Sequence, residues 1–469
     1  MADLEADVPA PVQQKDSAYV PSRYLSLSHQ DDGALVVHCA RTGAVGVVPA
    51  EDAERARRAL VANQVTKGPF TGVLQDLVYG GFLVPQGTDE TAQVHNQYVS
   101  RYMDRSLHLI VMPTEQCNFR CVYCYESFLR GEMDPGLQEG IKRFVAGQQD
   151  LEHFYLSWFG GEPLLAAETV LRLTDHFRRY TEDRGIELYT LATTNGYLLT
   201  PEYADRVIPA GLKRFQITLD GPEHEHDKRR VGANGEPTFA RIWNNLAHLR
   251  RSEHDFKVVL RHNFDPASLP KMQDFLGMLK DEFGGDPRFG LEMEAIGRWG
   301  GANDSSLDVC EDRALVEAVR QARQLTVEAG FRDVHALPGM QVNGNVCYAA
   351  NPKSFVIGSD GKVYKCTVEL DYHDRNVVGQ LHPDGRMDLD WKKMALWCET
   401  DGMEEGKKCT SCYFSPTCHG AACPKEWMEE PECACPTGKR FIRDSLTLIR
   451  AESLFEVPDT APVASCPKG

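Results

Sequence analysis

The sequence predicts an α/β protein built around a parallel sheet, with a small N-terminal unit before it and a cysteine-rich region after it. Three observations support this fold class. Apolar strand segments alternate with helical segments between residues 106 and 330. Short strand segments followed by helical segments occupy residues 19–88. Ten of the 15 cysteines lie between residues 347 and 466.

The part of the chain before residue 105 divides into three segments. Residues 1–18 are polar, which predicts a disordered leader. In residues 19–88, YLSLS and ALVVHCA flank an Asp-Asp-Gly turn, AVGVVP adds a strand, and two helices and FLVP follow. Residues 89–104 are polar and are predicted to be a linker.

The central region, residues 105–335, carries six strand segments. They are LHLIVMP, FYLSWFG, ELYTLATT, RFQITLD, KVVLRHN and FGLEMEAI, and helical segments such as AAETVLRLTDHFRRY lie between them. Parallel strands need crossover connections, usually helices, so the alternation predicts a parallel sheet. A doubly wound sheet and a partial barrel both fit. In either fold, functional residues are expected at the C-terminal ends of the strands.

Composition excludes several classes of function. The formal charge is −17, whereas a nucleic-acid footprint needs basic surface, so no nucleic-acid partner is expected. No apolar run is long enough to span a membrane, and the acidic N-terminus lacks the apolar core of a signal peptide. We therefore expect a cytoplasmic protein with no membrane partner. In a reducing cytoplasm, clustered cysteines bind metal more often than they form disulfides.

A three-cysteine motif follows the first strand of the central region. Cys117, Cys121 and Cys124 have the spacing C-x3-C-x2-C. A structural zinc site takes four protein ligands, and a four-iron cluster normally takes four thiolates. Three thiolates on one loop would leave one iron open to bind a small molecule. The position of the motif after a first βα strand favours such a [4Fe–4S] cluster over a zinc site completed by a distant ligand.

Three further segments follow in order along the central region. WFGGEPLL ends the second strand, TTNG ends the third, and QITLDGPEHEHDKRR begins in the fourth. With the cysteine motif, they make residues 106–330 resemble the radical S-adenosylmethionine (SAM) superfamily. The resemblance implies a partial (β/α)6 TIM-type barrel, a [4Fe–4S] cluster, and cleavage of SAM to a 5′-deoxyadenosyl radical.

The resemblance also implies a role for each segment. In the family, the aromatic residue before the third cysteine packs near the adenine, and GGEP contacts the SAM amino group. Thr218 stands where the S-x-DGP stretch of the sulfatase and peptide maturases usually has Ser, and a later Arg contacts the SAM carboxylate. The implied cofactor-binding residues are Tyr123, Gly160, Gly161, Glu162, Pro163, Thr194, Asn195, Thr218 and Arg230. His224, His226 and Asp227 complete no tetrahedral metal set and are expected to be structural.

The C-terminal region, residues 340–469, resembles the SPASM domain, which holds two auxiliary [4Fe–4S] clusters in many radical SAM enzymes. Its cysteine spacing C-x2-C-x5-C-x4-C is one residue longer at the last step than the family's usual pattern. The resemblance implies Cys347, Cys366 and Cys423 for the first auxiliary cluster, and Cys409, Cys412, Cys418 and Cys435 for the second. A pair of zinc sites is the rival interpretation, because C-x2-C suits both metals.

Several cysteine assignments stay open. Cys435 is preferred to Cys433 because it begins a Cys-Pro entry into the final helix. The fourth position of the first auxiliary cluster is either an open iron or Cys310. The cysteines expected to be ordinary free thiols are Cys39, Cys398 and Cys466.

The order of the three regions resembles that of radical SAM peptide maturases. Residues 19–88 resemble the winged-helix-like recognition elements that bind a leader peptide by adding a strand to a sheet edge. The resemblance implies a precursor peptide with a leader as substrate, a thioether or C–C cross-link as product, and SAM with three [4Fe–4S] clusters as cofactors. An electron donor such as flavodoxin or ferredoxin is implied as partner.

Two other functions are alternatives to peptide cross-linking. Sulfatase maturation, which forms formylglycine, uses an Asp directly after the cysteine of the G-x4-C element, but Thr367 follows Cys366 here. A non-catalytic iron–sulfur or zinc scaffold that binds peptide would need no cofactor cradle. Glu126 and Glu369 are weak candidates for a catalytic base.

Overall fold

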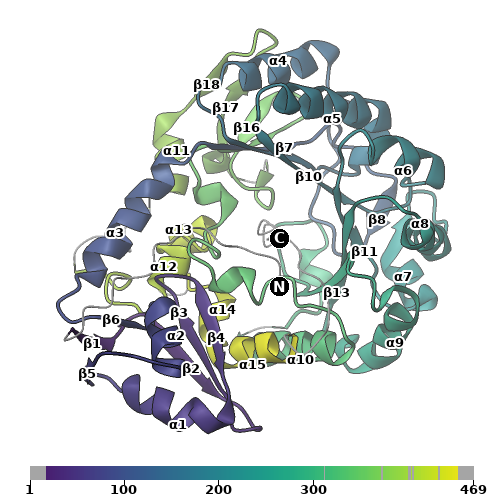
Figure 1. Ribbon diagram of the computed structural model, residues 1–469. Coiled ribbons are helices and arrows are strands. Elements are labelled where there is room, and N and C mark those ends of the chain that lie inside the picture. The colour runs from purple at the N-terminus through teal and green to yellow at the C-terminus, as the bar shows by residue number, and fades with distance from the viewer. Residues whose placement is uncertain are drawn as a thin grey trace. The chain divides into compact units, whose positions relative to one another are not determined.

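The computed structural model describes residues 17–310, 312–370, 373–399, 403, 406–430 and 434–452. These residues form two compact units (Figure 1). The first unit draws on Met1–Asp104, Val334–Asn351 and Cys398–Lys468, and the second on Arg105–Asp333 and Pro352–Trp397. Most of the predicted leader, together with Cys433 and Cys466, lies outside the described residues. The domain boundaries expected from the sequence stay predictions.

All six predicted strands of the central region form one sheet in the second unit. They are β7 (Ser106–Val111), β9 (His153–Trp158), β10 (Glu187–Thr194), β11 (Arg214–Thr218), β13 (Lys257–Phe264) and β14 (Phe289–Ala295). Each strand pairs in parallel with the next one along the chain. The strands therefore lie in the sheet in the same order as in the sequence, which is the topology of a barrel and not of a doubly wound sheet. The prediction of a partial barrel is confirmed, and the doubly wound alternative is wrong.

Helices cover the outer face of this sheet (Figure 1). They are α4 (Pro135–Ala146), α5 (Ala167–Glu182), α6 (Pro201–Val207), α8 (Phe239–Arg251), α9 (Met272–Phe283) and α10 (Asp312–Glu328). The ring of Phe177 on α5 lies 5.1 Å from that of Phe154 on β9. The indole of Trp158 donates a hydrogen bond of 3.0 Å to Thr174 on the same helix. Apolar residues at helical spacing therefore bury the outward side chains of the strands.

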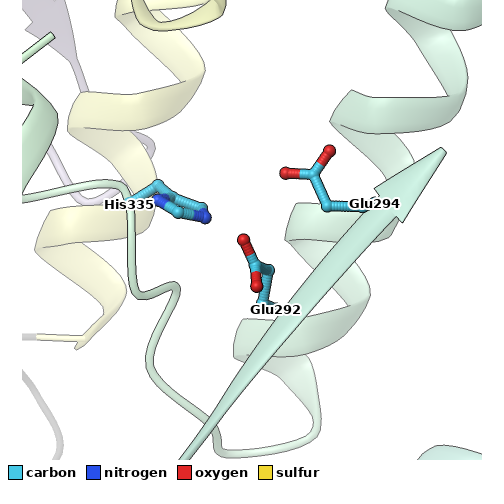
Figure 2. Close-up of side chains that lie close together, drawn as sticks. All are labelled: Glu292, Glu294 and His335. Carbon is cyan, nitrogen blue, oxygen red and sulfur yellow. The ribbon is translucent and has the colours of Figure 1, made fainter. Parts of the chain in front are cut away.

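The other face of the sheet is polar. The rings of Tyr155 and Tyr189 stack across β9 and β10 at 4.7 Å. Glu292 and Glu294 point to the same side of β14, as alternate residues of a strand do (Figure 2). The carboxylate of Glu292 accepts a hydrogen bond of 2.5 Å from the side chain of Gln216. The barrel thus offers polar groups on its inner face.

Two hairpins predicted after residue 350 extend the same sheet at its first edge. The four strands are β15 (Ser354–Ile357), β16 (Lys362–Tyr364), β17 (Val377–Leu381) and β18 (Met387–Leu389). β15 pairs in parallel with β7, and the other three continue in antiparallel order. The sequence pattern predicted the hairpins within the tail. Their pairing with a strand 246 residues earlier is non-local, so the sequence pattern does not indicate it.

The N-terminal part of the first unit contains the predicted strands and helices. One antiparallel sheet consists of β2 (Leu25–His29), β3 (Leu35–Cys39) and β4 (Ala44–Val48), and a second of β1 (Ala18–Pro21), β5 (Thr66–Lys67) and β6 (Leu83–Pro85). The helices are α1 (Ala50–Ala59) and α2 (Val73–Tyr79). The expected linker is largely a helix, α3 (Glu90–Ser100), whose first turn is capped by Asp89 through a 2.9 Å bond from Ala92 N.

The C-terminal part of the first unit packs on the β2–β3–β4 sheet. Its helices are α12 (Ser415–Cys418), α13 (Pro424–Glu429), α14 (Thr437–Arg440) and α15 (Ile442–Glu452), and α11 (Trp391–Cys398) precedes them. Leu446 and Ile449 of α15 join Val36 and Phe414 in one buried cluster. Leu35 and Val37 face the opposite side, toward α1 and α2. Strand β3 is therefore buried on both faces. Within the described residues, no helix is long and apolar enough to cross a membrane.

Candidate active site

The three-cysteine motif lies on the loop that follows β7, at the C-terminal end of the strand. The short strand β8 (Phe119–Cys121) in this loop pairs with β12 (Arg230–Gly232), which sets Cys121 opposite Arg230. Burial raises the pKa of the Cys117 thiol, and the charges of Glu162 and the other two cysteines raise it further. Burial, Glu126 and Cys121 raise the pKa of Cys124 to about 12. Crowded thiols that resist ionisation together suit a bound metal centre, whose positive charge stabilises the thiolates.

Gly160 and Gly161 hold the start of this loop close to the second strand. A Cβ on Gly160 would lie 2.4 Å from the Thr114 carbonyl oxygen, and one on Gly161 would lie 2.4 Å from that of Gln116. The φ angle of Gly160 is +119°, which also favours glycine. The next residue, Glu162, donates its N–H to Gln116 O at 2.9 Å. The glycine pair therefore allows backbone-to-backbone packing that positions the cysteine loop.

Glu162 joins the ends of the second and third strands. Its fully buried carboxylate accepts hydrogen bonds from Leu164 N at 2.9 Å, Thr194 Oγ1 at 2.7 Å and Asn195 N at 2.7 Å. Burial outweighs these bonds and raises the pKa of the carboxyl above its usual value. The side chain of Asn195 donates to Asn118 on the cysteine loop at 2.8 Å. The structure thus brings the residues predicted in GGEP and TTNG together.

Tyr123 lies at the centre of a buried polar network. Its hydroxyl donates to Asp220 and accepts from Arg230 Nη1 at 2.7 Å and from Asn263 Nδ2 at 3.1 Å. Asp220 also accepts from the backbone N–H of Asn263 at 2.9 Å. Burial acts to raise the pKa of Asp220, but the charge of Arg230 and two nearby histidines leave it below its usual value. Asp220 and Asn263 were not singled out in the sequence, although Asp220 belongs to the DGP segment.

Arg230 offers a buried N–H donor next to the cysteine loop. The side chain is buried, and within the described part of the chain its Nε–H has no hydrogen-bond partner. The thiolate form of Cys121 is one of the charges that raise the pKa of the guanidinium. A buried N–H is rarely left unsatisfied, so this group fits an anionic ligand such as a carboxylate. Thr218, buried at the end of β11, pairs in register with Arg261.

The two glutamates proposed as bases differ in their surroundings. Glu126 is partly buried, and no described residue hydrogen-bonds to its carboxylate. Burial raises its pKa to about 8, with Glu115 and Glu162 adding to the shift. Glu369 is buried and held by two N–H groups of Arg375, one of them at 3.0 Å. Of the two candidates, Glu126 is the one with a carboxylate available to a ligand.

Four cysteines line one small pocket in the first unit. They are Cys409, Cys412, Cys418 and Cys435, the set expected for the second auxiliary cluster. Burial and the other three thiols raise the pKa of Cys418 to about 12. Trp427 and Lys439 line the same pocket. Their convergence makes this tetrad a candidate metal centre.

The cysteines expected for the first auxiliary cluster are divided between the units. Cys347 and Cys423 belong to the first unit, where Cys347 N donates to Ala421 O at 2.9 Å. Cys366 belongs to the second unit and accepts from Val368 N at 3.4 Å. Their shared cluster stays a prediction, as does the role of Cys310. Cys39 is buried in the apolar core of the first unit, and Cys398 is buried as well.

Comparison with known proteins agrees with the motifs. Residues 111–266 match the family model of the radical SAM superfamily. The mycofactocin maturase MftC of Mycobacterium ulcerans is 25% identical over 334 residues, which cover 68% of this chain and 85% of that protein. The serine-type anaerobic sulfatase-maturating enzyme of Klebsiella aerogenes is 23% identical over 343 residues, covering 68% and 79%. These matches bear out the resemblance inferred from the sequence.

The fold has a solved counterpart. The structure of native anSMEcpe with bound AdoMet and Cp18Cys peptide aligns with a TM-score of 0.54 at 17% identity. The alignment covers 74% of this chain and 99% of that one. At this identity the likeness concerns the fold, and it confirms the predicted α/β partial barrel.

Proposed function

This chain is a radical SAM enzyme, and we propose that it matures a ribosomally made precursor peptide by forming a thioether or C–C cross-link. The observation that carries the proposal is the cysteine loop at the barrel's C-terminal end. Its three crowded thiols lie beside the guanidinium of Arg230, whose Nε–H has no hydrogen-bond partner among the described residues. When bound, a [4Fe–4S] cluster and SAM supply the 5′-deoxyadenosyl radical by one-electron cleavage of a C–S bond. Hydrogen abstraction from the peptide then starts the cross-link.

The chain's own residues provide the cradle for this chemistry. Cys117, Cys121 and Cys124 would hold three irons of the cluster. The buried Nε–H of Arg230 would donate to the carboxylate of SAM, and Tyr123 keeps the guanidinium in place by accepting from its Nη1. Glu126 would exchange a proton with the substrate, because its carboxylate has no hydrogen-bond partner among the described residues.

A groove in the first unit supports the recognition of a leader peptide. It has a volume of about 920 Å³ and runs between β4 and α2. β4 is an edge strand of its sheet, and such an edge can pair with an added strand. Val47 and Tyr79 line the groove with exposed apolar surface, while Asp52 and Asp76 add negative charge. A leader segment with apolar side chains and a neighbouring Lys or Arg would complement it.

We assign Cys347, Cys366 and Cys423 to a first auxiliary [4Fe–4S] cluster with an open iron, and four further cysteines to a second. The pocket lined by Cys409, Cys412, Cys418 and Cys435 supports the second. These clusters would accept the electron that the substrate loses when the cross-link closes. A flavodoxin or ferredoxin in the cytoplasm would supply the first electron.

Anaerobic reconstitution tests the proposal. With SAM and a strong reductant, the wild-type protein should produce 5′-deoxyadenosine, and a Cys117→Ala/Cys121→Ala/Cys124→Ala variant should not. Equal product from both proteins would refute radical chemistry at this loop. About twelve irons per chain are expected for three four-iron clusters, while about four irons together with zinc would favour the zinc interpretation of the tail. Short peptides encoded beside the gene, assayed by mass spectrometry for hydrogen loss, would identify the substrate.

Formylglycine formation is disfavoured by the residue after Cys366. Thr367 is buried and has no carboxylate to act as a base. A non-catalytic scaffold is disfavoured because it would need neither the glycine packing at Gly160 and Gly161 nor a buried guanidinium beside the thiols.

A further inference from the structure

Lys439 donates a hydrogen bond to a sulfur atom of the cysteine tetrad in the first unit. The donor is its Nζ and the acceptor is Cys435 Sγ, at 3.5 Å. The lysine lies on α14, four residues after Cys435, which precedes the Pro436 N-cap of that helix. It is half-buried and lines the same pocket as the four thiols.

The ammonium has no acidic partner in the part of the chain that the structure describes. Its polar contact is the sulfur atom of Cys435, at 3.5 Å. Most lysines near a surface carboxylate form exchangeable ion pairs, as Lys425 does with Glu429 at 2.8 Å. Lys439 instead directs its positive charge at sulfur. This geometry places a cation against the proposed ligands of the metal centre.

We propose that Lys439 raises the reduction potential of the auxiliary cluster held by Cys409, Cys412, Cys418 and Cys435. The inference rests on the proposed function, since it requires an iron–sulfur cluster at these cysteines. When the cluster accepts one electron, it gains one negative charge, and no bond to Lys439 forms or breaks. A cation that donates N–H bonds to the cluster sulfurs stabilises this more negative state. The cluster then accepts the electron released by the peptide more readily.

The test compares the reduction potential of the cluster after removal of Lys439 with its potential after removal of a lysine that does not contact a sulfur atom. Lys439→Met removes the charge and the N–H donor while keeping a side chain of similar length. Lys407→Met is the matched control, because Lys407 is exposed on the same segment as Cys409 and makes no bond to a sulfur among the described residues. Lys439→Arg keeps the charge and the donors. Each change is made in a Cys117→Ala/Cys121→Ala/Cys124→Ala background, which removes the radical SAM cluster.

Potentiometric titration followed by electron paramagnetic resonance provides the readout. The signal that is absent from a Cys412→Ala protein belongs to this cluster. At a fixed solution potential, Lys439→Met should lower the ratio of reduced to oxidised cluster about tenfold, which equals a shift of about 59 mV for a one-electron couple. Lys407→Met should leave the ratio unchanged, and Lys439→Arg should restore most of it. Identical titration curves for Lys439→Met and Lys407→Met would overturn the proposal.

Iron analysis distinguishes a failure of the cluster assignment from a failure of the role proposed for Lys439. If the parent protein holds zinc at the four cysteines, the cluster assignment and the role of Lys439 both fall. If it holds iron and the potential does not move, only the role of Lys439 falls. If Lys439→Met fails to retain iron, Lys439→Gln, a neutral donor, replaces it. Its potential must then lie below that of Lys439→Arg, and an equal or higher value would refute the proposal.

Discussion

At Gly161, the backbone of the cysteine loop occupies the space that the Cβ of any other residue would need. In Gly161→Ala, the Cβ would lie 2.4 Å from Gln116 O and 2.7 Å from Glu115 O, and neither backbone atom can rotate away. The loop must shift, and its three thiols lose their mutual position. We expect iron in the reconstituted protein to fall from about twelve toward about eight per chain, and 5′-deoxyadenosine to fall at least tenfold.

Gly277→Ala is the control for this substitution. Gly277 lies within α9, and a Cβ there meets no atom within 4 Å. Iron content should stay at the wild-type value, and stability should rise by roughly 0.5–1 kcal/mol, because alanine favours the helix over glycine. A Gly161→Ala protein with full iron would show that the close packing of the loop is dispensable.

The hydroxyl of Tyr123 makes hydrogen bonds with three buried residues. Tyr123→Phe removes a hydrogen bond from each of Asp220, Arg230 and Asn263. Buried charged groups that lose a partner destabilise the fold by about 1–3 kcal/mol, so urea denaturation should shift by that amount. Because Tyr123 positions Arg230, KM for SAM should rise more than kcat falls.

Tyr197→Phe is the matched control, since the ring of Tyr197 packs on Phe119 while its hydroxyl makes no hydrogen bond among the described residues. This variant should unfold and bind SAM as the wild type does. Equal behaviour of the two Tyr→Phe variants would exclude Tyr123 as a positioning residue.

At the scale of single elements, the exposed edge of β4 is the feature with a functional consequence. Val47 lies in this edge strand, lines the groove and is 37% exposed. Val47→Lys places a charge where an apolar side chain of the leader would pack and repels a basic leader. The Kd for the identified precursor should rise at least tenfold, about 1.4 kcal/mol, by fluorescence anisotropy. Formation of 5′-deoxyadenosine without peptide should not change.

Val61→Lys provides the comparison, because Val61 is 47% exposed and lies outside the groove. Its affinity for the precursor should match that of the wild type. If both variants bind equally well, the leader docks elsewhere on the chain.

Elements with a strong local signal were the ones that could be predicted. The six barrel strands and the hairpin of β2 and β3 follow from apolar runs and turn residues, which act within a few positions of the chain. The helix α3 was missed because its segment is polar, and its Asp89 cap is a weak signal in a single sequence. Placement of β15 beside β7 was missed because strand pairing across the chain is a tertiary event.

At the scale of the whole molecule, segments that are far apart in the sequence pack together in one unit. Described residues from the N-terminal and the C-terminal parts of the chain contribute to the first unit, where α15 covers the face of the β2–β3–β4 sheet opposite to α1 and α2. The N-terminal unit and the cysteine-rich tail therefore share one core. Residues 19–88, which resemble a separate recognition element in the sequence, therefore also contribute to the core against which the cysteine-rich region packs.

The proposed ligands of iron and SAM were predicted from the sequence, by the cysteine spacing and by the resemblance of the GGEP segment to that of the radical SAM superfamily. Motif spacing is local and survives without knowledge of the fold. Asp220 and Asn263 around Tyr123, and Lys439 beside the tetrad, emerge only from packing. Tyr123 hydrogen-bonds to Asp220 and Asn263, which lie 97 and 140 residues away in the chain, so these bonds exist only once the chain has folded. Lys439 lies only four residues after Cys435, but its contact with that sulfur depends on the folded conformation of the chain between them.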